Sequence, residues 1–407
     1  MGRLMKDSGI PYIGSIPKNW KLLPMGLFFY ENKKANRDFL SANALQFKYG
    51  EIIQKPKKES LTLEDIELLK KYTLVKPNDI VINGLNLNYD FNSMRVARVR
   101  EEGIITSAYI VIRARDSHNT QFHNYLLKAL DNQKVFHGMG EGIRLTLKFP
   151  EIKEMLLPYP LPAEQQKIAD FLDWKCTEVD ELIALEEKMI EELKAYKQSV
   201  ITETITKGLN PDVPMKDSGI EWIGQIPEHW GICKIQYLAD MRSGHNLTTE
   251  QIQPDGVYPV FGGNGIRGYY SQFEYDGNYV LVGRQGALCG NVNYANGKFW
   301  ATEHAIVCHP RTQFNTIWFG EALRSMNLNQ YSLSAAQPGL AIERIKTLPI
   351  CLPTLDEQNQ IANYLQKKCK EIDSLISIKQ SKIAELQDYK KSIIYEYATG
   401  KKEVPTL

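Results

Sequence analysis

The chain has 407 residues, of which 43% are hydrophobic and 24% are charged, with a formal net charge of +1. This length exceeds what one hydrophobic core supports, and the composition is that of an ordinary globular protein of two or three domains, which excludes a disordered or collagen-like chain. The N-terminal MGRLMKDSGI lacks the apolar core of a signal peptide, and no apolar run reaches the roughly 18 residues of a membrane helix, so we expect no membrane partner.

The first element is a phrase that occurs twice, as MKDSGIPYIGSIPKNW at residues 5–20 and as MKDSGIEWIGQIPEHW at residues 215–230. Eleven of its sixteen positions are identical, at a separation of 210 residues. A sequence repeated in this way is typical of a duplicated structural unit. We therefore expect the chain to contain two copies of one frame.

A variable region follows the first copy at residues 21–157 and carries 21 Lys and Arg against 16 Asp and Glu. Its runs DIVING and ITSAYIVIR are β-branched and are bounded by Gly and Asn, as expected of short strands. These features predict an α/β or mostly β globular domain with a modest preference for a polyanion.

Two long segments repeat each other at a separation of 193 residues, one beginning EQQKIADFLDW at Glu164 and the other EQNQIANYLQK at Glu357. Both are rich in Glu, Lys, Leu, Ile and Gln and contain no internal Gly or Pro. This composition predicts two helices of about 44 residues, each following a proline and ending near Gly208 or Gly400.

Apolar residues recur along both segments at alternate spacings of four and three, which predicts a coiled-coil seam. Other apolar residues widen the stripe beyond what one partner helix would cover. We expect these off-seam residues to dock partner subunits; they are Leu182, Leu185, Met189, Leu375 and Ile378. The alternative is a helix that lies along its own domain. Residues 163–206 carry 5 Lys and Arg against 11 Asp and Glu, a balance that suits a protein partner better than DNA.

The second variable region does not resemble the first, although NYVLVGRQG and WATEHAIVCH have the same strand-like character. Its FGGNG motif at residues 261–265 fits the F-x-G-x-G loop of a nucleotide or S-adenosylmethionine site. The residues that follow favour strands rather than the helix that such a site needs, so we interpret the motif as a recognition loop or β-turn. His304 and Cys308 lack a second ligand pair, and no metal site is predicted. The six cysteines are scattered, as expected of free thiols in a reducing cytoplasm, where we place the protein.

The frame SGIEWIGQIPEHW, a variable domain and then LP…EQQKIADFLDWKCTEVDELI…KSII, present twice in the same order, resembles the specificity subunit of type I restriction–modification systems. The resemblance covers essentially the whole chain. It implies an α+β fold with two globular α/β target-recognition domains separated by a long antiparallel two-helix coiled coil, in a pseudo-twofold internal repeat. The expected parts are a first recognition domain at 1–157, a first helix at 158–208, a second domain at 209–350, and a second helix with a C-terminal tail at 351–407.

The same resemblance implies a non-catalytic subunit that reads a bipartite, asymmetric target in double-stranded DNA. It further implies docking of two methylation subunits and two restriction subunits through the coiled coil. The cofactors S-adenosylmethionine, ATP and Mg²⁺ are implied for those partners, and none is implied for this chain.

Candidate DNA contacts follow from residue chemistry, because Arg, Lys, Asn, Gln and Ser read base edges while Lys, Arg and Tyr bind phosphates. In the first domain we expect contacts from Lys48, Tyr49, Asn83, Asn86, Asn88, Asn92, Arg95 and Tyr109. In the second domain we expect contacts from Asn264, Arg267, Tyr269, Tyr270, Arg284 and Gln285. The alternatives are a solvated Asn-rich loop in the first domain and a hairpin with aromatic core residues in the second.

The sequence is also compatible with two other functions. One is a self-contained DNA methyltransferase or nuclease whose active site is not recognisable, which methyl transfer by the isolated chain would reveal. The other is a coiled-coil scaffold that binds only proteins, which binding to duplex DNA would weaken.

Overall fold

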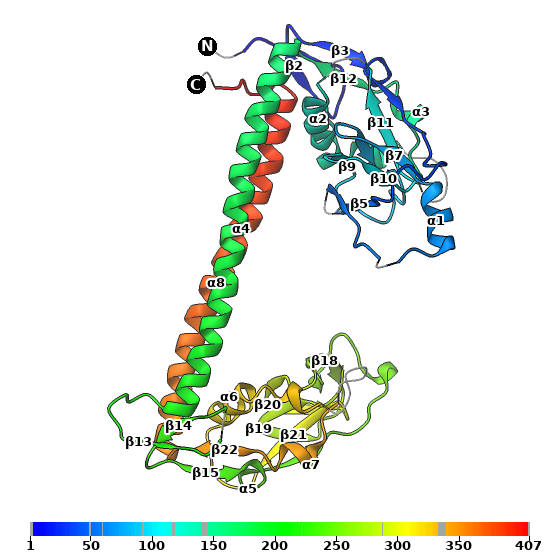
Figure 1. Cartoon of the computed structure of the whole chain (residues 1–407). Coiled ribbons are helices and arrows are strands. Elements are labelled where there is room, and N and C mark those ends of the chain that lie inside the picture. Colours follow the sequence, from blue (N-terminus) through cyan, green and yellow to red (C-terminus); the bar gives the residue numbers. More distant parts are fainter. Residues whose placement is uncertain are drawn as a thin grey trace. The chain divides into compact units, whose positions relative to one another are not determined.

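The computed structural model describes residues 3–48, 50–58, 60–91, 93–115, 119–139, 145–220, 222–286, 288–332 and 339–405. The chain divides into two compact units, Met1–Glu186 with Ser381–Leu407, and Glu187–Gln380. Each unit contains one α+β domain and one end of each of two long helices (Figure 1). Among the described helices, none combines the length and the apolar character needed to cross a membrane.

The two long helices are α4 (Pro162–Lys207) and α8 (Leu355–Ala398). Both confirm the helices predicted from composition, and each ends just before a glycine in the left-handed region, Gly208 at φ 77° and Gly400 at φ 76°. Glycine adopts this conformation without the steric cost that a Cβ brings, and it is the common terminator of a helix.

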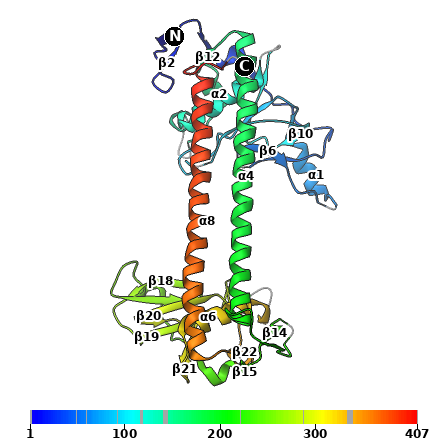
Figure 2. The same ribbon diagram turned by 90° about the vertical axis from the view of Figure 1, so that its left-hand side faces the viewer.

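The helices run antiparallel within each unit, where their ends lie side by side (Figure 2). In the first unit Lys390 binds Asp180 at 2.5 Å and Lys382 binds Glu186 at 2.6 Å. Residue numbers increase along α4 from the first pair to the second and decrease along α8, so the two helices are antiparallel. In the second unit Lys197 binds Asp373 at 2.7 Å. Within the two units, many of the residues that give the alternating spacing of four and three are buried; they include Leu172, Cys176, Val179, Ile190, Val200, Leu365, Ile372 and Ile393.

A sheet of four antiparallel strands forms the centre of the first domain. In spatial order the strands are β4 (Phe29–Glu31), β11 (Ile110–Ala114), β8 (Ile80–Ile82) and β9 (Val96–Arg98). Ile80 and Ile82 belong to the cluster that contains Phe122, whereas Val81 between them belongs to a second cluster with Leu45. Because both faces are buried, the strand is a continuous apolar run without alternation.

Further elements cover the two faces of this sheet. Helix α2 (Thr120–Asn132) packs on β9, and its N-cap Asn119 accepts a hydrogen bond from the N–H of Phe122. On the other face lies the hairpin of β5 (Leu45–Lys48) and β6 (Glu51–Gln54). The remaining elements are η1 (Met25–Leu27), α1 (Leu63–Lys70), β7 (Thr73–Val75) paired with β10 (Gly103–Ile105), η2 (Val135–Gly138) and α3 (Phe149–Ile152).

The second domain is built on a different, larger sheet of six strands. In spatial order these are β16 (Ala239–Ser243), β21 (Ala305–Pro310), β19 (Tyr275–Gly283), β20 (Val292–Ala301), β17 (Tyr258–Gly262) and β18 (Gly265–Tyr270). All neighbours are antiparallel except β17 and β20, which are parallel. Helix α6 (Thr316–Ser325) covers one face. Short helices complete the domain: α5 (Ile235–Leu238), η3 (Thr249–Gln251), η4 (Leu328–Tyr331) and α7 (Ile342–Ile345).

The repeated phrase folds into the same hairpin twice. The first copy contains β1 (Met5–Asp7) and β2 (Ser15–Pro17), and the second contains β13 (Met215–Asp217) and β14 (Gln225–Pro227). Their registers are equivalent, since Met5 faces Pro17 and Met215 faces Pro227.

A second pair of strands closes each domain at its base. The strand that follows each hairpin, β3 (Lys21–Pro24) or β15 (Gly231–Lys234), is antiparallel to the strand that precedes the next long helix, β12 (Leu156–Tyr159) or β22 (Pro349–Leu352). The variable sheets are thus inserted into one frame, which brings the two ends of each insertion together.

Candidate nucleic-acid interface

The first candidate surface combines the turn of the β5–β6 hairpin with the loop between β8 and β9. Lys48 is exposed at the end of β5, and Gly50 follows in the turn at φ 74°. A Cβ on Gly50 would lie 2.8 Å from the Cβ of Met94, so the turn packs directly against the end of the loop. The hairpin whose first strand ends at Lys48 therefore contacts the end of the Asn-rich loop. Tyr49 and Asn92, which we expected to contact DNA, lie outside the described residues.

Arg95 lies beneath this loop and is only 1% exposed. Its guanidinium donates hydrogen bonds of 2.6 Å to the backbone carbonyls of Leu85 and Asp90. Its backbone N–H donates to Asp131, whose pKa is raised by burial, an effect that this bond opposes. The expectation that Arg95 reaches DNA itself is thereby corrected, because its donors hold the loop from inside the domain.

The other candidates of the first domain differ in exposure. Asn86 is exposed and its backbone lies in the left-handed region, at φ 52°, while Asn88 is half-buried. The Oδ1 of Asn83 accepts the N–H of Leu85 at 3.2 Å, so this side chain shapes the start of the loop. Tyr109 packs edge-to-face on Phe47 of β5, with ring centroids 6.1 Å apart. Lys48 and Asn86 are the two exposed side chains among the described candidates of this domain.

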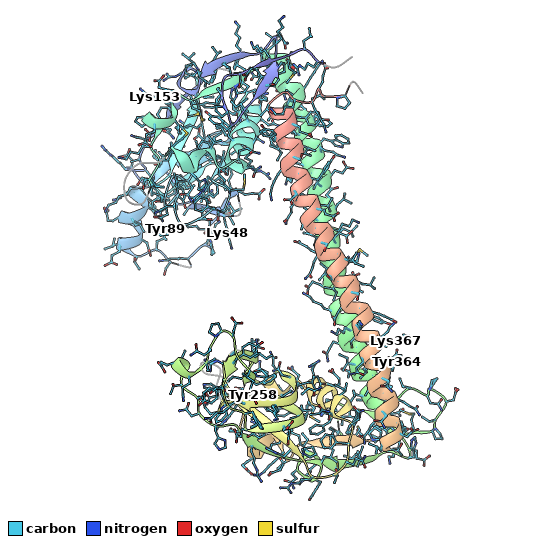
Figure 3. All side chains as sticks on the ribbon, turned by 180° about the vertical axis from the view of Figure 1, so that it is seen from behind. Lys48, Tyr89, Lys153, Tyr258, Tyr364 and Lys367 are labelled. Carbon is cyan, nitrogen blue, oxygen red and sulfur yellow. The ribbon has the colours of Figure 1, made fainter. Side chains whose placement is uncertain are left out.

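Sequence reasoning missed the two most prominent side chains of this loop, Tyr89 and Phe91. They are 74% and 54% exposed. Figure 3 shows Tyr89 and Lys48 along one edge of the first domain and Lys153 at the opposite edge. The available signal was a tyrosine flanked directly by Asn88 and Asp90 in a polar loop.

The second candidate surface lies at the turn between β17 and β18. The FGGNG motif forms this turn between antiparallel strands, which confirms the β-turn interpretation and excludes the strand–turn–helix of a cofactor loop. Asn264 and Arg267 are exposed there, and the Nδ2 of Asn291 donates to the Oδ1 of Asn264 at 2.7 Å. Gly263 allows close backbone packing, since a Cβ there would lie 3.2 Å from the carbonyl oxygen of Gln285.

Arg284 and Gln285 lie on the segment that packs against this turn. The Nη1 of Arg284 donates to the Oγ of Ser243 at 2.9 Å, and its backbone N–H donates to the carbonyl of His304 at 2.8 Å. The exposed Gln285 lies with its Oε1 3.0 Å from the Nδ1 of His304. The structure thus brings four predicted residues together and adds two that sequence reasoning missed, Ser243 and His304.

The tyrosines of β18 are half-buried rather than free. Tyr270 packs edge-to-face on Trp300 with centroids 5.4 Å apart, and the backbone of Tyr269 exchanges two hydrogen bonds with Gln253. These contacts match the alternative of a hairpin stabilised by aromatic packing. Among the described residues, no group of three His, Cys, Asp or Glu side chains is arranged to hold a metal ion.

The off-seam residues of the long helices are a third set of candidates. All five are between 37% and 63% exposed, in contrast to the buried seam residues; they are Leu182, Leu185, Met189, Leu375 and Ile378. Met189 also contacts the opposite helix, because the Nζ of Lys379 on α8 lies 3.4 Å from its Sδ. Large apolar side chains that remain exposed along a helix are typical of a surface that a partner covers.

Comparison with known proteins places this architecture in one family. The family model of the type I restriction modification DNA specificity domain matches residues 31–195 and 227–388, one match in each half of the chain. The MjaVIII specificity subunit of Methanocaldococcus jannaschii is 23% identical over 424 residues, covering 96% of this chain and 95% of that protein. The EcoprrI specificity subunit of Escherichia coli is 43% identical over 134 residues, a match that spans only 33% of that protein.

Solved structures show the same fold. A chain from a type I R-M system, studied for its complex assembly and conformational transition, superposes with a TM-score of 0.70 at 16% identity, covering 95% of this chain and 99% of that one. The HsdS subunit of Thermoanaerobacter tengcongensis superposes with a TM-score of 0.51 at 16% identity, covering 97% of this chain and all of that one. The chain therefore belongs to the family of type I restriction–modification DNA specificity subunits, the non-catalytic recognition components of those systems.

Proposed function

We propose that the two variable domains, bounded as residues 1–157 and 209–350, each read one half of a bipartite, asymmetric DNA target. The observation that carries this proposal is the contrast between frame and insert. The hairpins and closing strands repeat in equivalent register, whereas the inserted sheets have four and six strands in unrelated orders. Two different recognition domains held in equivalent frames suit a DNA target whose two halves differ in sequence.

The chemistry of the exposed residues supports DNA as the ligand. Lys48 and Asn86 in the first domain, and Asn264, Arg267 and Gln285 in the second, are exposed side chains of the kinds that read base edges or bind phosphates. Arg284 adds a guanidinium that Ser243 holds in place. We assign base reading to these groups, since phosphate contacts alone carry no sequence information.

We further propose that α4 and α8 dock the catalytic partners of the system through the off-seam apolar residues. Two methylation subunits fit the two copies of the frame, and two restriction subunits complete the assembly. S-adenosylmethionine belongs to the methylation subunits, and ATP with Mg²⁺ belongs to the restriction subunits. The exposed Leu185 and Met189 support this assignment, because such residues commonly form the buried core of an interface.

Exchange of one domain tests the proposal. Residues 21–157 are replaced by the corresponding segment of another specificity subunit, and methylated adenines are mapped in cells that express the partner subunits. We expect one half of the target to change while the other half and the ability to assemble are kept. The matched control replaces the insert of the second domain and should change the other half. A chimera that alters both halves would refute independent reading.

A further inference from the structure

The loop between β8 and β9 is anchored to the first domain at several points. Leu87 is fully buried in the main core cluster, and its N–H donates to the carbonyl of Leu145. Arg95 binds the carbonyls of Leu85 and Asp90 at 2.6 Å each. The Nε2 of His137, itself a buried residue of η2, lies 3.0 Å from the same carbonyl of Asp90. The backbone on both sides of Tyr89 is thus held by side chains that rise from the domain interior.

This anchoring leaves one large side chain unsupported at the centre of the loop. Tyr89 is 74% exposed, although its neighbour two residues earlier is fully buried. Phe91 is also exposed, but one face of its ring stacks on His137 with centroids 4.9 Å apart and planes 22° apart. An aromatic ring of this size exposed on a fixed backbone is available for a contact with a ligand.

The surroundings of Tyr89 indicate the chemistry of its ligand. Asn86 is exposed in the same loop, and the hairpin turn that carries Lys48 packs against Met94 at the end of the loop. Amides and a lysine beside an aromatic tip suit a polyanion that also presents polar and methyl-bearing edges, and the grooves of duplex DNA present both.

We propose that Tyr89 contacts the bases of the half-site read by the first domain, and that Arg95 and His137 are positioning residues that fix the loop for this contact. The inference rests on the proposed function and deepens it by naming a residue that reads DNA. The anchored backbone means that the ring is presented without an ordering step, so little conformational entropy is lost on binding.

Binding of duplexes by the complete chain assembled with its methylation subunits tests the contact. Three duplexes are compared: the target established by adenine mapping, the target with its first half scrambled, and a random sequence. We expect Tyr89→Ala to weaken binding to the intact target by about tenfold or more, the usual scale for one base contact. Tyr89→Phe should bind as the wild type does, because the ring makes the contact. Binding to the scrambled and random duplexes should not change.

The control is Tyr237→Ala, which removes another exposed tyrosine, on α5 at the edge of the second domain opposite β18 (Figure 1). It should alter none of the three affinities. The inference is overturned if Tyr89→Ala binds the intact target normally, if it weakens all duplexes equally, or if it lowers assembly with the methylation subunits instead. A wild-type chain that does not distinguish the intact target from random DNA would remove the proposed function itself, and the inference with it.

The positioning role has its own measurement. His137→Leu removes the group near the carbonyl of Asp90, whereas the side-chain amide of His137→Gln can still donate to it. We expect the leucine variant to lose discrimination at the first half-site while it keeps its unfolding temperature and its reading of the second half-site. The glutamine variant should recover the discrimination. Equal behaviour of the two variants would assign His137 a packing role only.

Discussion

The indole Nε1 of Trp230 donates a hydrogen bond of 3.0 Å to the carboxylate of Glu357 at the start of α8. Trp20 donates the same bond, also of 3.0 Å, to Glu164 at the start of α4. The tryptophans are 210 residues apart and the glutamates 193, so the bond is kept although the intervening domains differ in length. The repeated phrase is therefore a joint that attaches each hairpin to the long helix following its domain.

The joint in the second unit should be sensitive to acid. Burial alone would raise the pKa of Glu357, but hydrogen bonds from Trp230, His229 and Thr354 outweigh it and lower that pKa to about 2 from 4.5. A carboxyl whose pKa is lower in the folded state stabilises the fold above its unfolded pKa. We expect this contribution to be complete above about pH 4.5 and to be lost as the pH falls through about 2.

Thermal unfolding of the intact chain between pH 7 and pH 3 measures this effect. Glu357→Gln should lower the unfolding temperature at pH 7 and flatten its fall toward pH 3. The matched control is Glu371→Gln, on the exposed face of the same helix, where the carboxylate has only a 3.9 Å ion pair with Lys368. Parallel pH profiles for Glu357→Gln and the wild type would contradict the assignment.

Arg284→Ala should impair recognition of one half-site only. The guanidinium is held by Ser243 beside the FGGNG turn, and loss of a base contact costs about 1–3 kcal/mol. Affinities of the assembled complex for duplexes altered in either half measure the effect. Arg311→Ala, which removes a more exposed arginine paired with Asp240 in the same unit, serves as the control. Equal weakening on every sequence would mean that Arg284 contacts only phosphate.

Leu185→Lys with Met189→Lys should weaken assembly with the methylation subunits. Both side chains are exposed and belong to neither recognition domain, so the substitutions should leave those domains folded. Burying two lysines in an interface without partners carries a large desolvation cost. Size-exclusion chromatography with light scattering measures the assembly, and circular dichroism checks the fold. Leu63→Lys, on the exposed face of α1, is the control, and undiminished assembly of the double variant would refute the docking surface.

Sequence predicted the long helices well, because their periodicity and composition are local properties. It did not predict the strand orders of the two sheets, which depend on pairings between distant segments such as β17 with β20. Arg95 shows the same limit within the site. A basic residue beside an Asn-rich loop suggests a DNA contact, but burial under carbonyl groups is set by tertiary packing. Tyr89 was missed for the converse reason, since exposure of an aromatic ring cannot be read from its type.

The joint also predicts that the covalent link between the two halves is dispensable. In the second unit the end of α4 passes through residues 209–214 into the hairpin, and a Cβ on Gly208 would lie 3.1 Å from the ring of Trp230. In the first unit the end of α8 meets the other hairpin without such a link. A Cβ on Gly400 would lie 2.9 Å from the ring of Trp20, and the Nζ of Lys401 donates to the carbonyl of Ile13 at 2.6 Å.

A circular permutant tests this equivalence. A short Gly/Ser linker joins Pro405 to Met5, and the chain is opened between Gly208 and Met215. Arg3 and Leu4 line one cavity of about 980 Å³ together with Glu403, Val404 and Pro405, so a short linker suffices. The dipeptide Val-Pro precedes Met215 at residues 213–214, and the same dipeptide occurs at residues 404–405, where the linker would begin.

We expect the permutant to fold, to assemble with methylation subunits and to methylate the same target as the wild type, because each hairpin keeps its helix contacts without a peptide link. Closing one loop and opening another of similar length changes the chain entropy little. The matched control opens the chain inside the FGGNG turn, between Gly263 and Asn264, where the break falls within a candidate recognition surface. That control should lose recognition of the second half-site. A permutant that fails to assemble while the control succeeds would show that the link at residues 209–214 holds the joint together.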